Sequence, residues 1–147
     1  MPANLHPLLV HFPIALLIAS FLFDLIAALS KRDTFEKAAF WNLTFGLIAA
    51  AVTAVAGLQA EESVPPFPAM RETVERHETL AFITLGAFAL LFLWRVAKGG
   101  KLFVRFRVYY LLLAFIGVLS LSATAYYGGE LVYKFGVGIQ QSPKWNK

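Results

Sequence analysis

The chain has 147 residues, of which 59% are hydrophobic and only 15% are charged. A soluble domain of this length needs more polar side chains to cover its surface, so the composition predicts a membrane protein. The absence of cysteine excludes disulfides, cysteine-ligated iron–sulfur clusters and covalently attached c-type haem. The net charge of +4 comes from lysine and arginine residues between apolar runs, which argues against a nucleic-acid partner.

Four apolar stretches lie at about residues 8–29, 40–58, 77–97 and 108–127. Each approaches the roughly 20 residues that a helix needs to cross the hydrocarbon core. Because the segments between them are short, the sequence predicts a single all-α domain, an up-and-down bundle of four transmembrane helices. The first stretch has no basic region before it and no small-x-small cleavage site after it, so we expect it to remain as a membrane anchor.

The first stretch opens on NLHPLLVHFPIAL, residues 4–16, which holds two histidines and two prolines. Pro7 suits the first helical position, where its missing N–H costs nothing. Pro13 lies further inside and leaves the carbonyl of Leu9 without its usual donor. We therefore expect a kink or a widened turn near His11.

Asp24 is the one carboxylate inside an apolar run. An ionisable residue in a membrane helix is a candidate for function. Because Asp24 lies about two turns from the end of the first stretch, we expect it to pair with Lys31 or with a basic residue of the third loop.

The second and fourth stretches carry small residues at four-residue spacing, which lets a neighbouring helix approach closely. These residues are Gly46, Ala50 and Ala54 in the second stretch and Ser120, Thr124 and Gly128 in the fourth. Between the second and third stretches, QAEESVPPFPAMRETVER is rich in proline and predicts an ordered or semi-rigid loop. Gly128 and Gly129 predict the end of the fourth helix, so we expect residues 128–147 to form an interfacial tail. This tail either lies along the outer interface or folds back over the mouth of the bundle.

Basic residues predict the orientation of the bundle. The first and third loops hold most of those near the spans, namely Lys31, Arg32, Lys37, Lys98, Lys101, Arg105 and Arg107. By the positive-inside rule these loops are cytoplasmic, and both chain termini lie on the outer side of the membrane. Aromatic residues then fall at the interfaces, with Trp41, Trp94, Tyr109 and Tyr110 at the inner one and Tyr126 and Tyr127 at the outer one.

This topology places all three histidines at the outer end of the bundle. His77 opens the third helix, which runs parallel to the first and lies diagonally across the core, so we expect His11 and His77 to face each other. His6 and His11 are five residues apart and share no helix face, which argues against a pair of metal ligands on one helix. Three interpretations remain: two axial ligands of a haem, interfacial histidines bonded to backbone or headgroups, or a metal site with Glu61, Glu62, Glu78 or Glu130.

The favoured interpretation is one haem b with His11 and His77 as iron ligands, in an electron-transfer protein or a subunit of a respiratory or redox complex. We expect His6 to act as a lid over the haem and Arg76 to pair with a propionate. Backbone N–H groups near Gly136 and Gly138 would also bond to the propionates. Glu78 would either orient His77 or interact favourably with the helix N-terminus.

The rival hypothesis is a cofactor-free accessory subunit whose outer end docks onto a larger complex. In that case the histidines and the segment GGELVYKFG would organise the end of the bundle. A transporter has less support, because the four stretches show neither an inverted repeat nor a charge at mid-membrane. The sequence also holds no nucleophile elbow, Walker loop or zinc-protease motif.

Three motifs, HPLLVHFPIALL, RHETLAF and GGELVYKFGVG, resemble a family of bacterial four-helix membrane proteins, the domain-of-unknown-function family numbered twenty-two thirty-one. The residues that match its motif positions are His6, Pro7, His11, Pro13, Asp24, His77, Gly129, Tyr133, Gly136 and Gly138. The resemblance implies a four-span inner-membrane domain. It also implies electron-transfer partners, because the domain occurs alongside Rieske-type and other redox modules. The chain departs from the family in GLQAEE, where a more aromatic or aspartate-containing ending is typical.

Overall fold

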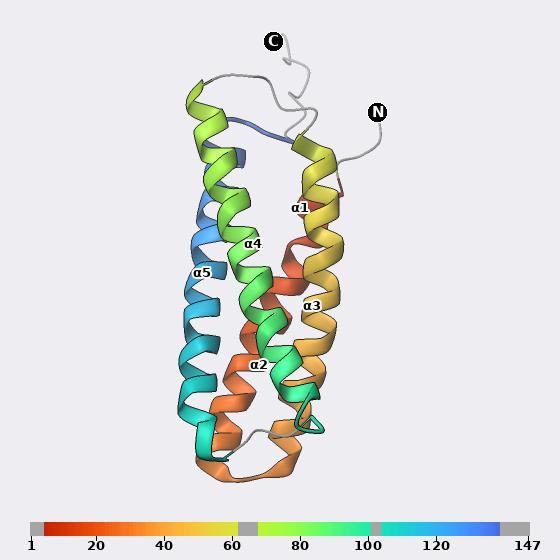
Figure 1. Cartoon of the computed structure of the whole chain (residues 1–147). Coiled ribbons are helices and arrows are strands. Elements are labelled where there is room, and N and C mark those ends of the chain that lie inside the picture. The colour runs from red at the N-terminus through yellow and green to blue at the C-terminus, as the bar shows by residue number, and fades with distance from the viewer. Residues whose placement is uncertain (1–4, 62–67, 101–103, 139–147) are drawn as a thin grey trace, which may run out of the picture.

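The computed structural model describes residues 5–61, 68–100 and 104–138 (Figure 1). Its elements are α1 (His6–Leu9), α2 (His11–Ser30), α3 (Asp33–Glu61), α4 (Pro68–Val96), the 3-10 helix η1 (Val104–Phe106) and α5 (Arg107–Tyr133). Four segments are long and apolar enough to cross a membrane, with α1 and α2 together forming the first. No strand occurs in the described ranges. The predicted all-α bundle of four spans is confirmed.

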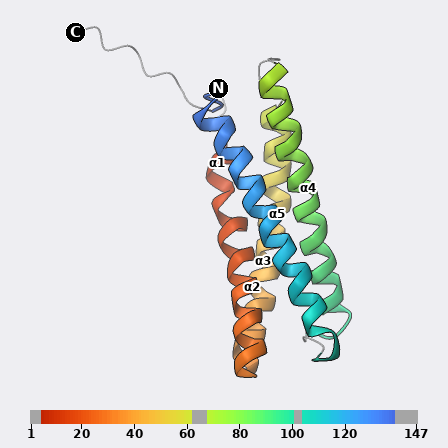
Figure 2. The ribbon, with the colours of Figure 1, turned by 90° about the vertical axis from the view of Figure 1, so that its left-hand side faces the viewer.

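Two helical hairpins make up this bundle, one formed by α1–α3 and the other by α4 and α5. In Figure 1, α2 and α4 run in one direction while α3 and α5 return in the other. Across the bundle α2 lies against α5 and α3 lies against α4, so α2 and α4 are diagonal (Figures 1 and 2). We call the end that carries His6 and His77 the histidine end, and the opposite end, which carries Asp24, the aspartate end.

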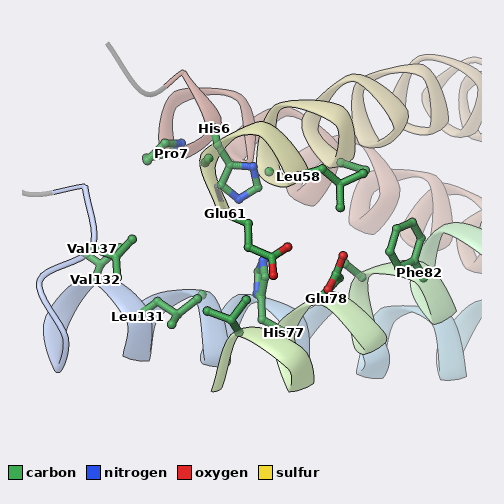
Figure 3. Close-up of a pocket in the computed structure, with 16 residues that line it drawn as sticks. His6, Pro7, Leu58, Glu61, His77, Glu78, Phe82, Leu131, Val132 and Val137 are labelled. Carbon is green, nitrogen blue, oxygen red and sulfur yellow. The ribbon is translucent and has the colours of Figure 1, made fainter. Parts of the chain in front are cut away.

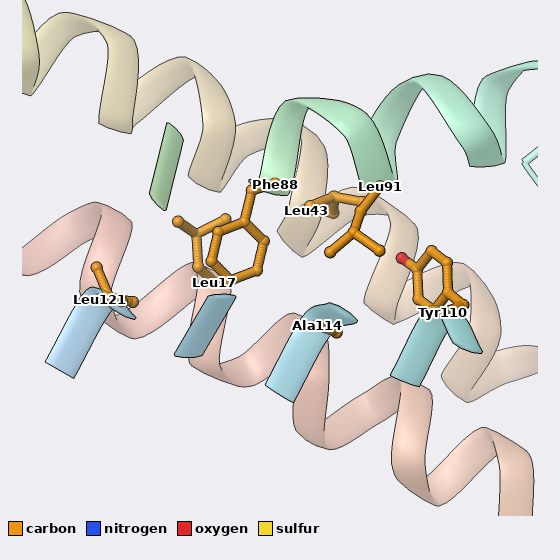
Figure 4. Close-up of a cluster of buried hydrophobic side chains, with 7 residues drawn as sticks. All are labelled: Leu17, Leu43, Phe88, Leu91, Tyr110, Ala114 and Leu121. Carbon is orange, nitrogen blue, oxygen red and sulfur yellow. The ribbon is translucent and has the colours of Figure 1, made fainter. Parts of the chain in front are cut away.

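All four long helices contribute to one buried apolar cluster (Figure 4). Its members are Leu17, Leu43, Phe88, Leu91, Tyr110, Ala114 and Leu121. The outward faces are apolar as well, with exposed residues that include Leu22, Ile48, Leu90 and Ile116. Helices that are apolar on every side suit a hydrocarbon solvent, because their backbone groups bond within each helix and their side chains need no water.

Glycines let the helices of each hairpin approach closely. A Cβ atom on Gly46 of α3 would lie 2.8 Å from Cδ2 of Leu17, and one on Gly117 of α5 would lie 3.1 Å from Cε2 of Phe88. Both glycines are buried. Small residues at these positions therefore allow each second helix to pack against the first.

The helices extend beyond the apolar stretches from which they were predicted. Helix α3 begins at Asp33 and α4 begins at Pro68, so His77 lies well inside α4 rather than at its start. Two ion pairs at four-residue spacing support this first part of α4, Arg71–Glu75 at 3.1 Å and Arg76–Glu72 at 2.6 Å. Counting apolar residues locates the part of a helix within the hydrocarbon and misses its polar continuation.

The fourth span also ends later than predicted. Helix α5 continues through Gly128 and Gly129 to Tyr133, so the helix end expected at these glycines is wrong. The chain then turns at Gly136, whose φ is +69°, and the N–H of Val137 donates to the carbonyl of Leu131 at 3.0 Å. Val137 lines the cavity at the end of the bundle. The remainder of the expected tail, residues 139–147, lies outside the described residues.

The distortion expected near His11 is present. Helix α1 ends at Leu9 and α2 begins at His11, with Val10 between them. Pro13 has no N–H to donate to the carbonyl of Leu9, and the next bond, from Ile14 N–H to the carbonyl of Val10, is 3.4 Å long. The break separates His6 from the regular helix that follows.

A buried ion pair joins the two hairpins at the aspartate end. Asp24 Oδ1 and Arg95 Nη1 are 2.7 Å apart, and each side chain is 1% exposed. Arg95 also donates to the carbonyls of Glu36 at 2.7 Å and Gly100 at 3.1 Å. The partner of Asp24 is thus Arg95, at the end of α4, and not Lys31. Tyr110, predicted at the interface, is instead buried against this guanidinium group.

Candidate functional site

Two histidine rings face each other at the histidine end. The ring centres of His6 on α1 and His77 on α4 are 6.1 Å apart, and the ring planes are inclined by 84°. Both residues are half-buried. Figure 3 shows that they reach toward each other from the two different hairpins. The pair therefore bridges the interface between hairpins at one end, as Asp24 and Arg95 do at the other.

A backbone carbonyl holds each ring in place. His6 Nδ1 lies 3.0 Å from the carbonyl oxygen of Thr53, and His77 Nδ1 lies 2.9 Å from that of Thr124. A carbonyl accepts a hydrogen bond, so Nδ1 carries the proton and donates in both rings. In this tautomer Nε2 carries the lone pair that binds a metal, and metal-binding histidines are commonly oriented by such a bond.

A glycine one turn beyond each of these threonines makes room for the ring. A Cβ atom on Gly57 would lie 3.0 Å from Cε1 of His6, and one on Gly128 would lie 3.1 Å from Cε1 of His77. The threonine and glycine belong to TAVAG in α3 and to TAYYG in α5. Both histidines precede their threonine by 47 residues. Each hairpin thus supplies the same three features: a histidine, a threonine carbonyl that bonds to its ring, and a glycine that leaves room for the ring.

The rings line a cavity with two lobes. The larger lobe has a volume of about 430 Å³ and reaches inward to Leu17 and Leu121, within the range of about 300–1,000 Å³ typical of small-molecule pockets. The smaller lobe, shown in Figure 3, has a volume of about 120 Å³ and is lined mainly by α3 and α4. Residues that line both lobes are His6, Pro7, Ala54, His77, Ala81, Gly128 and Val132.

Thr53 brings an unsatisfied hydroxyl group to the larger lobe. Its side chain lines this lobe and the residue is only 8% exposed. Within the part of the chain that the structure describes, its Oγ1 atom has no hydrogen-bond partner. The equivalent hydroxyl of Thr124 donates to the carbonyl of Ser120 at 2.9 Å. The α3 and α5 walls of the cavity therefore make the same contacts with their histidine rings. They differ in polarity, because the Thr53 hydroxyl lacks a partner among the described residues and the Thr124 hydroxyl has one.

A family model described as a predicted membrane protein (DUF2231) matches residues 2–141. The chain belongs to this DUF2231 family. The match confirms the resemblance seen in the motifs, and the family description agrees with the four apolar spans. No curated protein and no solved structure matches the chain.

In this DUF2231 protein the ring opposite His77 is that of His6. The sequence had suggested His11 at this place, and that expectation is wrong. His11 is exposed, although its side chain contributes to the wall of the larger lobe. Positions five apart on a helix point about 140° away from each other, and the break at Val10 separates the two residues further. Only one of them can therefore turn toward α4, and the carbonyl of Thr53 lies where His6 reaches it.

Arg76 lies apart from the histidine pair. It is exposed, and it contacts Glu72 at 2.6 Å and the hydroxyl of Tyr127 at 3.4 Å. It lines neither lobe of the cavity. Because its guanidinium group is held on the outer face of α4, the structure gives no support to contact between Arg76 and a ligand in the cavity.

The remaining candidates fall into three groups. Glu61 and Glu78 line the smaller lobe (Figure 3), whereas Glu130 pairs with Lys134 at 2.6 Å. Gly136 and Gly138 adopt positive φ angles and do not line the cavity, but Val137 between them does. Asp24 lies at the opposite end of the bundle, and Glu62 lies outside the described residues.

The described residues hold no group of three or more His, Cys, Asp or Glu side chains that could bind a metal ion. The candidate ligands that face each other at the histidine end are the two imidazoles of His6 and His77. The sequence had not identified three residues as parts of this site, namely Thr53, Gly57 and Gly128. It had also not identified the role of the Thr124 carbonyl. The repeated pattern TAxxG, 47 residues after a histidine, is the signal that identifies them.

Proposed function

We propose that this protein binds one haem b, with the iron between Nε2 of His6 and Nε2 of His77. The observation that carries the proposal is the opposition of two imidazoles whose Nδ1 atoms both donate to backbone carbonyls. A metal–imidazole bond is about 2 Å long and the ring centre lies roughly 1 Å beyond the nitrogen, so two opposed ligands place their ring centres about 6 Å apart. The separation of 6.1 Å between His6 and His77 agrees with this value.

The number of ligands favours haem over a bare metal ion. A structural or catalytic metal ion takes three or more protein ligands, and the described residues offer no such group. A haem supplies four equatorial nitrogens itself and needs only two axial ligands. Two histidines are therefore sufficient for haem and insufficient for a closed metal site.

The cavity around the rings also suits a flat apolar ligand. Its shared walls consist mostly of small or apolar residues, among them Ala54, Ala81 and Gly128. The lobes continue on from the histidine pair between the two hairpins, into the larger volume near Leu17 and the smaller one near Glu78. A planar macrocycle that passes between the imidazoles would occupy this space without displacing large side chains.

Two histidine ligands define the class of function. When both axial positions are occupied by protein side chains, no position is left for oxygen or for a substrate, and the haem supplies one-electron transfer. His6 and His77 would hold the iron, and the carbonyls of Thr53 and Thr124, which accept from Nδ1 of the two rings, would keep the rings in that orientation. We therefore infer an electron-transfer protein or a redox-complex subunit of a bacterial inner membrane, with the histidine end on the outer side.

The absorption spectrum of detergent-purified protein tests this proposal. We expect a Soret band and, after reduction with dithionite, a sharp α band typical of two histidine ligands. His6→Ala and His77→Ala should each abolish this spectrum, since each removes one axial ligand. His11→Ala should keep the spectrum of two histidine ligands, since His11 is not one of them. Arg76→Ala is the control and should leave the spectrum unchanged, because Arg76 lines neither lobe of the cavity. A colourless preparation from haem-replete cells would refute haem binding and favour a cofactor-free accessory subunit.

A further inference from the structure

The two hairpins repeat one another at an offset of 71 residues, which is the separation of Asp24 and Arg95. The same offset relates His6 to His77, Thr53 to Thr124 and Gly57 to Gly128. It also relates buried residues along both hairpins, which pair as Pro13 with Thr84, Leu17 with Phe88, Ser20 with Leu91, Ala39 with Tyr110, Leu43 with Ala114 and Gly46 with Gly117. The repeat thus extends over the core and is not confined to the site.

Two contacts join a residue to its own counterpart, and they locate a symmetry axis. His6 faces His77 at the histidine end, and Asp24 pairs with Arg95 at the aspartate end. A contact between a position and its symmetry mate must cross a two-fold axis. Because α2 and α4 run in the same direction (Figure 1), this axis runs along the bundle and relates two parallel repeats, as in membrane proteins built from same-facing halves.

We infer that the chain is a duplicated helical hairpin whose pseudo-two-fold axis passes between His6 and His77, and that haem binds on this axis in two orientations related by a 180° rotation. The inference rests on the proposed function. Protohaem is nearly symmetric about the line that passes between its two propionates and through the iron. Rotation about that line returns the iron and both propionates to their places and exchanges methyl with vinyl groups at the opposite edge.

If the pocket has the same two-fold symmetry as the haem, the two orientations make equivalent contacts. One orientation can be preferred only through lining residues that differ between the two hairpins. The ring contacts do not differ, since each imidazole has the same carbonyl partner and the same glycine. At the inner end of the larger lobe, however, Ala50 of α3 is matched by Leu121 of α5. The opposite charges of Asp24 and Arg95 lie at the other end of the bundle, remote from the cavity.

The size of the preference follows from the chemical difference between the substituents. A vinyl group exceeds a methyl group by one carbon, and burial of one carbon changes an equilibrium by about fourfold. For one such difference we therefore expect the minor orientation to make up about one fifth of the bound haem. The orientation that places the vinyl group nearest the axis next to Leu121 should be disfavoured, because Leu121 occupies more space than Ala50.

Proton NMR of the oxidised protein in detergent tests this inference. A low-spin ferric haem shifts its four ring-methyl signals away from those of the protein, so two orientations should give eight such signals. An iron porphyrin in which methyl groups replace the vinyl groups should collapse the doubled set. The exchange Ala50→Leu with Leu121→Ala should invert the intensity ratio at nearly constant core volume, and Leu119→Ala, on the exposed face of α5, should leave it unchanged.

The outcomes separate the two proposals. Protein that shows the spectrum of two histidine ligands but only four methyl signals would overturn the two-orientation inference and leave haem binding intact. Doubled signals that persist with the symmetric porphyrin would also overturn it, because the doubling would then come from the protein. A colourless preparation would instead refute the proposed function.

Discussion

His6 and His77 depend for their placement on residues of the following helix in their own hairpin. Each Nδ1 atom bonds to a threonine carbonyl, and each ring lies against a glycine where a side chain would collide with it. Such outer contacts set the tautomer and the direction of a metal-binding imidazole, and their loss commonly costs 10- to 100-fold in metal affinity. Thr53 and Gly57, and their mates in α5, therefore belong to the site as positioning residues.

Gly57→Ala and Gly128→Ala should each weaken haem binding by about 10- to 100-fold. The added methyl group would lie about 3 Å from an imidazole carbon and push the ring away from its carbonyl partner. Titration of the apoprotein with haem, followed by the Soret band, measures the affinity. Gly86→Ala is the control, because a Cβ atom at Gly86 meets no other atom within 4 Å. Unchanged affinity in both site variants would contradict the positioning role.

The two hairpins are held together at the level of helices by a core and by one buried ion pair. Leu17 and Phe88 lie near the middle of the bundle, and Asp24 of α2 meets Arg95 of α4 at the aspartate end. Arg95 bonds in addition to the carbonyl of Glu36, in the first turn of α3, and to that of Gly100, in the turn after α4. The interaction thus fixes the position of α4 relative to both helices of the first hairpin.

Arg95→Leu should destabilise the bundle by about 3–5 kcal/mol, because it leaves the Asp24 carboxylate buried without a partner. Asp24→Leu together with Arg95→Leu should recover much of that loss, since an apolar pair carries no desolvation penalty. Thermal unfolding in detergent, followed by circular dichroism, measures the change. Arg71→Ala removes an exposed ion pair and should change stability little. An Arg95→Leu variant as stable as the parent would contradict this account.

The whole molecule presents an apolar surface along its length and places the histidine pair close to one end. Exposed apolar residues from all four spans face outward, so the surrounding medium is lipid. A haem bound as proposed would lie within reach of only one membrane surface. The side on which the histidine end lies would then decide which soluble partners could exchange electrons with it.

Cysteine labelling tests the orientation that the basic loops predict. The chain has no cysteine of its own. The only thiol that can react with a maleimide is therefore the one introduced by the substitution. Lys98→Cys at the aspartate end should react with an impermeant maleimide only from the cytoplasmic side, and Glu75→Cys at the histidine end only from the outside. Both native side chains are exposed. Reaction of Lys98→Cys from the outside would reverse the orientation.

Most of the fold could be predicted from the sequence. A helix that crosses the hydrocarbon core must have a certain length and an apolar composition, and both can be recognised in the sequence directly. The four spans and their diagonal arrangement are confirmed. Helix ends were less accessible. Helix α4 begins at Pro68 and gains support from pairs such as Arg76–Glu72, which carry no hydropathy signal, and α5 passes through Gly128 because that glycine serves a ring contact and not a helix end.

By itself the sequence determined that the protein crosses a membrane four times and that its three histidines gather at one end of the bundle, since span number and helix direction follow from local hydropathy. Only the tertiary structure decided that His6 faces His77 and that Asp24 pairs with Arg95. The direction of His6 depends on a carbonyl that lies 47 residues away. Such partners come together only when the two hairpins have packed, and no pattern within one helix records them.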